Sequence, residues 1–366
     1  MGRLGASLTR GLQTALFIAL LCASACSRKS APPAPPPLPP EARPTVTGGP
    51  SAPGRVLFAA ALLADGGVAW RGWLHLPVAG GKLARLPDSW RVPYEARVVT
   101  AARGGLLAWV GPRGEVGLAG PGGVRVVAND ADPAVDPVLL GRSGSFLYAR
   151  PTGDLVQIQD GRPTLVWQGD GGPIRGLAAS PDAERIAFVR HGNELVTVEL
   201  EKRETRIAYQ APQRRARLFF PRFVEDGGLL VRERTGSRAR LVHIRPARGA
   251  PGEVPLPPGS LRAFLPLRDG RLALGLARRS DRVQMGEIFV QARDGSSRRR
   301  VVSLPRTLPF SLPSCDGREL LLLDESGSPN RLVAFPLGGG SLRVLTGPSL
   351  RIRGWDAWAL LCPEAD

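Results

Sequence analysis

The sequence predicts an all-β fold of repeated four-stranded units, a β-propeller, and three observations predict it. A turn followed by a short apolar strand recurs about every 40 residues through residues 54–366. One copy, residues 174–209, divides into four strand-length apolar segments separated by short turns. With 45 Gly and 36 Pro in 366 residues, turns come often and long helices have no room.

Residues 1–25 have the pattern of a secretory signal. Arg3 and Arg10 give a positive start, and residues 15–21 form an apolar run too short for a stable membrane span. Small residues at positions 23–25 precede Cys26. The segment resembles a bacterial lipoprotein signal peptide, which implies cleavage before Cys26 and a diacylglyceryl group on its sulfur. Because Ala23 stands where Leu is usual, plain secretion and a retained anchor are the alternatives.

Residues 26–53 form a Pro-rich segment with almost no core-forming side chains, which is typical of an extended polyproline-type tether. At about 3.1 Å per residue, 24 such residues reach up to about 70 Å. A disordered leader without a spacing role is the alternative. Ser27 after the cysteine resembles the outer-membrane sorting pattern of enteric bacteria, so we expect a lipid-anchored protein of the bacterial cell envelope, at the outer membrane.

The best copy of the repeat carries the turn Ser180-Pro181-Asp182-Ala183 between its first two strands. Pro fixes φ at the second turn position and Asp bonds back to the backbone, so these residue types suit a tight turn. The turn resembles the S-P-D-G turn of TolB-like and WD40-like propeller repeats. The resemblance implies a propeller over nearly all of residues 54–366, although most other copies have lost the Ser and Pro.

The repeat count predicts seven complete units and an eighth half-unit. The turns begin at positions 65, 103, 143, 182, 226, 269, 316 and 356, with spacings of 38, 40, 39, 44, 43, 47 and 40 residues. We expect seven four-stranded blades, closed by pairing of residues 350–362 with the N-terminal unit. Eight blades with one truncated is the alternative, and a two-sheet sandwich is less consistent with the regular spacing.

The chain is strongly basic, with a formal net charge of +17. Lys occurs only three times among 49 basic residues, which fits a GC-rich coding bias. An exported protein seldom meets nucleic acid, so we exclude that partner. We expect envelope proteins as partners, with an anionic envelope polymer as a further electrostatic match.

No catalytic constellation, metal site or cofactor site is predicted. His75, His191 and His243 fall in three different units without a second ligand at metal spacing, and the Gly-rich runs lack the motif of a phosphate loop. Carboxylates could still gather at a propeller's channel, where the candidates are Asp132, Asp136, Asp170, Glu225 and Asp356. Turn chemistry alone explains Asp182, Asp226, Asp269 and Asp316.

The fold therefore favours a protein-binding or scaffolding module. The alternative is a hydrolase or lyase that acts on a sugar or peptide with carboxylates in the channel. Three converging carboxylates, or an acid with a His, would favour the enzyme, whereas scattered ones favour binding.

Aromatic and basic residues are the candidates for a binding surface. Most Trp residues fall within strands and are expected in the core, while Trp90 and Trp355 stand beside loops and are candidate anchors. The basic run Arg298-Arg299-Arg300 is a further candidate.

Cys315 and Cys362 are the thiols of the folded part, and export permits a disulfide between them. The expected register argues against the bond. It places Cys315 in the turn between the first two strands of its unit and Cys362 at the far end of a second strand, on the opposite face. A bridge between them would show that the C-terminal register is wrong.

Overall fold

In a computed structural model, the described elements all belong to one compact unit. The structure describes residues 54–64, 67–79, 82–86, 90, 92–100, 107–120, 123–140, 145–245, 250–280, 283–305, 311–347, 349–353 and 358–361. The predicted signal and tether, residues 1–25 and 26–53, lie outside this range. The described residues contain no helix that is long and apolar enough to span a bilayer.

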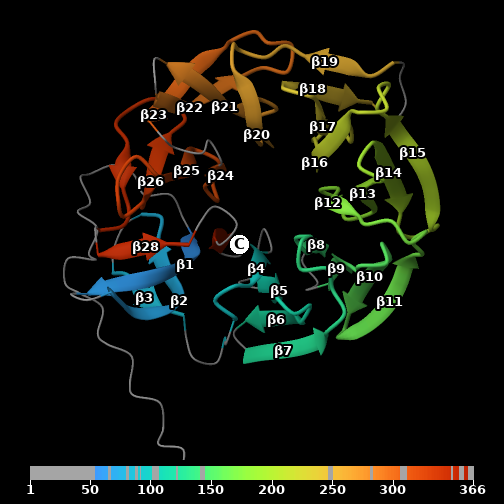
Figure 1. The fold of residues 1–366 in the computed structure, drawn as a ribbon, viewed down its shortest axis with the longest axis horizontal. Coiled ribbons are helices and arrows are strands. Elements are labelled where there is room, and N and C mark those ends of the chain that lie inside the picture. The colour runs from blue at the N-terminus through green and yellow to red at the C-terminus, as the bar shows by residue number, and fades with distance from the viewer. Residues whose placement is uncertain are drawn as a thin grey trace, which may run out of the picture. The chain divides into compact units, whose positions relative to one another are not determined.

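The fold is a seven-bladed β-propeller, as the repeat predicts (Figure 1). Each blade is an antiparallel sheet, and in blades 2 to 7 its strands follow one another in the chain. Blades 2 to 4 consist of β4 (Arg97–Thr100), β5 (Leu107–Val110), β6 (Val116–Gly120), β7 (Gly123–Ala128); β8 (Val138–Leu140), β9 (Ser145–Ala149), β10 (Leu155–Gln159), β11 (Arg162–Trp167); and β12 (Arg175–Ala179), β13 (Arg185–Arg190), β14 (Glu194–Glu199), β15 (Glu204–Gln210).

Blades 5 to 7 continue the pattern. They consist of β16 (Arg217–Phe223), β17 (Leu229–Thr235), β18 (Arg238–Ile244), β19 (Gly252–Val254); β20 (Ser260–Pro266), β21 (Leu272–Ser280), β22 (Val283–Gln291), β23 (Arg299–Pro305); and β24 (Ser311–Pro313), β25 (Glu319–Asp324), β26 (Arg331–Pro336), β27 (Arg343–Val344).

Blade 1 closes the ring with strands from both ends of the propeller. Its N-terminal strands are β1 (Arg55–Ala64), β2 (Gly67–Pro77) and β3 (Ala84–Arg85), and its C-terminal strands are β28 (Leu350–Ile352) and β29 (Trp358–Leu361). Both C-terminal strands pair antiparallel with β1, β28 opposite residues 60–62 and β29 opposite residues 55–58. The predicted closure by residues 350–362 is confirmed for the strands that the structure describes.

The closing blade corrects the predicted eighth half-unit. Because β28 and β29 flank the same edge of β1, they are two parts of one innermost strand, and the segment around Asp356 does not start another unit. The same correction applies to the first turn. Asp65-Gly66 joins β1 to β2, which are the second and third strands of blade 1, whereas the turns near residues 103, 143, 182, 226, 269 and 316 join first and second strands.

The first strands form the wall of the channel. β29 contacts β4, and contacts then run from β4 to β8, β12, β16, β20 and β24. Figure 1 shows these strands around the centre of the ring, with β7, β11, β15 and β19 at its rim. We call the face on which the chain enters these first strands the entrance face, and the opposite face, which carries the turns between first and second strands, the turn face.

Apolar side chains between neighbouring blades form the core. One cluster packs β25 and β26 of blade 7 against β1 and β2 of blade 1, and the C-terminal Leu350 and Ile352 belong to it. Trp73 and Trp109 are buried between blades 1 and 2, and Trp167 packs on Phe188, which confirms the core role expected for most tryptophans. Burial between every pair of blades makes the ring a rigid support for the residues at its channel.

Candidate functional site

The strand register places side chains from several blades at one height near the channel entrance. We count along each second strand from its first residue that pairs with the first strand, next to the hairpin at the turn face. The fourth residue faces Arg97 in blade 2, Arg175 in blade 4 and Phe219 in blade 5. In blade 6 it faces Ala263, and Arg262 stands next to this place, in the bulge between Leu261 and Ala263. Basic residues therefore recur at or next to this height in blades 2, 4 and 6.

In blades 2 and 3 the positive charge is neutralised. Arg97 Nη1 lies 2.9 Å from Asp136 Oδ1, across the boundary between the two blades. Asp136 is largely exposed, with 59% of its side chain accessible. This ion pair is worth little for stability because water screens it, but it fixes a local charge balance on this side of the channel.

In blades 4 to 6 the arginines have no such partner. Among the residues that the structure describes, no carboxylate lies within 4.0 Å of four side chains, which we call the arginine arc: Arg175, Arg222, Arg232 and Arg262. Arg175, Arg222 and Arg262 are exposed, whereas Arg232 is half-buried. The arc is thus a local excess of positive charge on a rigid wall.

Arg232 is held by two aromatic rings. Its guanidinium carbon lies 4.8 Å from the ring centre of Phe219 and 5.0 Å from that of Phe220, in cation–π contact with both. Nη1 donates to the carbonyl oxygen of Arg262 at 2.6 Å, and the buried Nε has no hydrogen-bond partner. Burial and, to a smaller extent, the charges of Arg234 and Arg262 together lower the pKa of Arg232 to about 10.

Local backbone geometry brings this cluster against blade 4. β12 and β16 each contain a bulge, and the bulge residues Gly176 and Phe220 have φ of 68° and 53°. A Cβ at Gly176 would lie 2.8 Å from Pro221 Cδ, so only glycine allows this close approach of the two strands. Phe220 accepts a left-handed backbone conformation, which a bulky residue rarely does.

Arg222 lies deeper on the same strand. Its Nη1 donates to the carbonyl oxygen of Pro221 at 3.1 Å. Its side chain is exposed, and the charge of Asp136 favours its protonated form. Arg222 therefore adds an accessible positive charge to the arc.

The structure does not bring the predicted channel carboxylates together. Asp132 accepts a hydrogen bond from the Ala134 N–H in its own loop, and Asp136 pairs with Arg97. Glu225 lies on the turn face, between β16 and β17, whereas Asp132, Asp136 and Asp170 precede first strands at the entrance face. Asp356 lies outside the described residues.

Turn chemistry accounts for the other acids, as expected. In each case the carboxylate accepts the backbone N–H two residues later, which is the geometry of an Asx turn. The four bonds run from Glu184 to Asp182, from Gly228 to Asp226, from Arg271 to Asp269 and from Arg318 to Asp316.

The histidines form no metal site in the described part of the chain, where no group of three or more His, Cys, Asp or Glu could hold an ion. His75 contacts Arg55, and His243 is buried. His191 Nε2 lies 2.9 Å from Asp170 Oδ2. His191 stands on the exposed turn between β13 and β14, and Asp170 stands on the link between β11 and β12, so the pair lies at the entrance face and outside the first strands themselves.

The candidate anchors are tied into the propeller where the structure describes them. Trp90 is half-buried against the apolar cluster of blades 1 and 2, and Trp355 lies outside the described residues. Arg298 donates to Gln291 at 2.9 Å, Arg299 to the carbonyl oxygen of Leu337, and Arg300 to the buried Glu287 at 3.1 Å. These three arginines sit at the outer edge of blade 6, far along the sheet from the channel strand.

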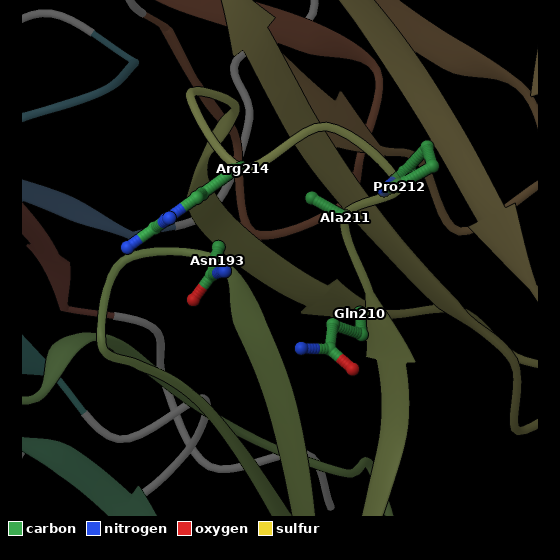
Figure 2. A pocket seen from close by; sticks show the side chains of 5 residues that line it. All are labelled: Asn193, Gln210, Ala211, Pro212 and Arg214. Atoms are coloured by element: carbon green, nitrogen blue, oxygen red, sulfur yellow. The ribbon is translucent and has the colours of Figure 1, made fainter.

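A surface pocket of about 330 Å³ lies on the entrance face between blades 4 and 5 (Figure 2). Asn193 comes from the β13–β14 turn, while Gln210, Ala211, Pro212 and Arg214 come from the end of β15 and the link to β16. Figure 2 shows the side chains of Asn193, Gln210 and Arg214 around this space. The pocket adds one more arginine to the face that carries the arc.

Cys315 takes part in a disulfide. Its partner lies outside the described residues, as does Cys362. The corrected register removes the earlier objection to a bond between these two, because β24 and β29, the strands that precede them in the sequence, are both first strands and end on the turn face in neighbouring blades. The pairing of Cys315 with Cys362 stays a prediction.

The arc was not predicted, although the sequence carries a signal for it. Arg175 and Arg262 each stand five positions before the residue whose N–H closes the first hairpin, Ser180 and Leu267. The two arginines fall at the same position of the repeat when the repeats are aligned on their first strands rather than on their turns. The part played by Arg232 needs the packed structure, because it comes from a second strand.

No protein-family model and no curated protein matches the chain. Solved structures match it in fold. TolB from Acinetobacter baumannii has a TM-score of 0.54 at 13% identity, covering 85% of this chain and 67% of that one. An oligogalacturonate lyase from Vibrio parahaemolyticus has a TM-score of 0.57 at 12% identity, with coverage of 81% and 87%.

A puromycin-hydrolyzing peptidase from Mycobacterium tuberculosis has a TM-score of 0.60 at 15% identity, and the match covers 84% of this chain but 52% of the peptidase. TolB, a lyase and a peptidase thus share this architecture. At such low identities the similarity shows the fold alone. The chain has a TolB-like β-propeller fold.

Proposed function

We propose that this protein is a cell-envelope lipoprotein whose propeller binds or scaffolds other proteins at the entrance face. The observation that carries the proposal is the distribution of charge at the channel. The described carboxylates there are engaged in a loop turn or an ion pair, whereas the arginines of blades 4 to 6 have no acidic partner. Charged groups that need a partner suit recognition, while acid–base catalysis needs converging titratable groups.

The anchoring part of the proposal rests on residues 1–53. The small residues before Cys26 and the Pro-rich segment after it support a lipid anchor with a spacer, which would hold the propeller away from the membrane. The similarity to TolB in fold is consistent with an envelope protein but does not identify a partner.

Photo-crosslinking in the cells that make the protein tests the binding function. A photoreactive phenylalanine analogue in place of Arg262 would stand at the channel entrance, and the same analogue in place of Arg162, on the outermost strand of blade 3, is the control. We expect a discrete adduct from the first position and none from the second. Absence of any adduct at the entrance, or equal labelling at both positions, would contradict the proposal.

An enzyme is the second candidate, because the described residues include one acid–His pair. Asp170 holds the ring of His191 at 2.9 Å, as a carboxylate does for a general base. Lyase and peptidase neighbours share the fold, so a sugar or a peptide is the substrate class to test. Turnover of polygalacturonate or of a peptide substrate by the wild type, lost in His191→Gln, would favour this candidate.

A further inference from the structure

We infer that the arginine arc is a binding site for the carboxylates of an acidic protein segment, which docks at the channel entrance over blades 4 to 6. The inference deepens the proposed function by naming the chemistry of the partner. It stands on the convergence of three blades at one place, on the packing around Arg232 and on the absence of a described counter-charge.

The arc presents four guanidinium groups near an aromatic pair, three of them exposed and that of Arg232 half-buried. Arg175 and Arg262 come from the two blades beside that of Phe219, Arg175 at the same height by register and Arg262 one residue away in a bulge. Both arginines are exposed, and no side-chain hydrogen bond is found for either among the described residues. Their donors are therefore free for an incoming acceptor, and a guanidinium presents a fork that matches a carboxylate.

Arg232 supplies the driving force at the centre of the arc. Its charge is partly desolvated, it is repelled by Arg234 and Arg262, and its buried Nε has no partner. A buried or half-buried charge without a partner costs free energy, which a bound anion recovers. A carboxylate beside Arg262 would lower the repulsion between the two guanidinium groups and thus bind more tightly than at an isolated surface arginine.

A protein segment fits this surface better than an acidic polysaccharide. The faces of Phe219 and Phe220 that meet Arg232 are occupied, so these rings do not offer a free pair of platforms for sugar rings. Pro221 and Leu261 beside the arginines are buried, so they offer no apolar platform for a sugar ring either. Carboxylates carried on flexible side chains can instead reach the separate guanidinium groups one by one.

The charge pattern also limits where the segment can lie. Asp136 stands on the blade 3 side of the channel and already neutralises Arg97. An acidic segment would be repelled there and attracted over blades 4 to 6, so the binding surface covers only that part of the channel entrance.

Binding of a fluorescein-labelled octaglutamate peptide to the full chain, purified in detergent, tests the inference by fluorescence anisotropy. We expect binding that weakens as salt is added, and no binding of octaglutamine. The double variant Arg175→Gln/Arg262→Gln should bind octaglutamate at least about tenfold more weakly, because it removes two charge-assisted contacts. Both residues are exposed, so we expect this variant to fold, and circular dichroism checks it.

The matched control is Arg125→Gln/Arg162→Gln, which removes the same charge from exposed outermost strands of blades 2 and 3. It should keep wild-type affinity within about twofold. An equal loss in both double variants would show attraction by net charge alone and overturn the site. Failure of the wild type to bind octaglutamate, or tighter binding of polygalacturonate that depends on Arg175 and Arg262, would overturn the peptide assignment. A crosslinked partner at position 262 would still support the proposed function after either failure.

Discussion

Deletion of Leu350–Asp366 should open the propeller, because the C-terminal strands provide the innermost position of blade 1. β28 and β29 pair with β1 at three and four positions respectively. The Asn330 side chain bonds to both the N–H and the carbonyl of Ile352, at 2.9 and 3.0 Å. Arg353 donates to the carbonyl oxygen of Tyr94 at 2.6 Å, so the same segment also ties blade 1 to the start of blade 2.

The size of the effect follows from burial. Leu350 and Ile352 are 0% and 2% exposed, and burying each aliphatic side chain stabilises a fold by about 1.5–3 kcal/mol. Together they contribute roughly 3–6 kcal/mol before any backbone hydrogen bond, each worth about 1 kcal/mol net, is added. The total is comparable to the whole stability of a domain, about 5–15 kcal/mol.

Size-exclusion chromatography and thermal melting of three variants check this reasoning. The truncated chain should aggregate or melt far below the wild type, since it exposes the edge of β1 and the apolar cluster between blades 7 and 1. Leu350→Ala should lose about 2–5 kcal/mol, and Arg351→Ala, whose side chain is exposed, should stay near wild type. A truncated chain that stays monomeric with an unchanged melting curve would refute closure by these strands.

Three further predictions concern single residues. Peptide mapping without reductant should link Cys315 to Cys362, and reduction should cost about 4 kcal/mol for a loop of this length; recovery of both as free thiols would contradict the pairing. Burial lowers the pKa of His243 below 6.5, so the stability that its neutral form contributes is complete above that pH and is lost as the pH falls. The free energy of unfolding, measured by denaturation between pH 7 and 5, should therefore fall less steeply with pH in His243→Leu than in the wild type. An alkyne fatty acid should label the wild type but not Cys26→Ser, and a labelled variant would disprove lipidation at Cys26.

The sequence by itself determined the all-β class, the four-stranded unit and the ring of seven blades. Turn residues such as Pro181 and Asp182 act on the backbone next to them, and short strands need only alternating or continuous apolar residues. The repeat near 40 residues can therefore be identified in the sequence without knowledge of tertiary contacts. The four predicted strands of residues 174–209 correspond to β12, β13, β14 and β15 within one or two residues.

Tertiary structure decided how the ring closes and which side chains meet at the channel. Residues 350–352 and 358–361 look like two strands of another unit because their turn signal is local, but pairing with β1, 288 to 306 residues earlier in the chain, makes them one strand. Arg175, Arg262 and Arg232 come from three blades and two strand positions, so their convergence depends on register, bulges and packing that no local pattern encodes. The physical reason is that turns depend on neighbours in sequence, whereas a binding surface on a propeller depends on neighbours in space.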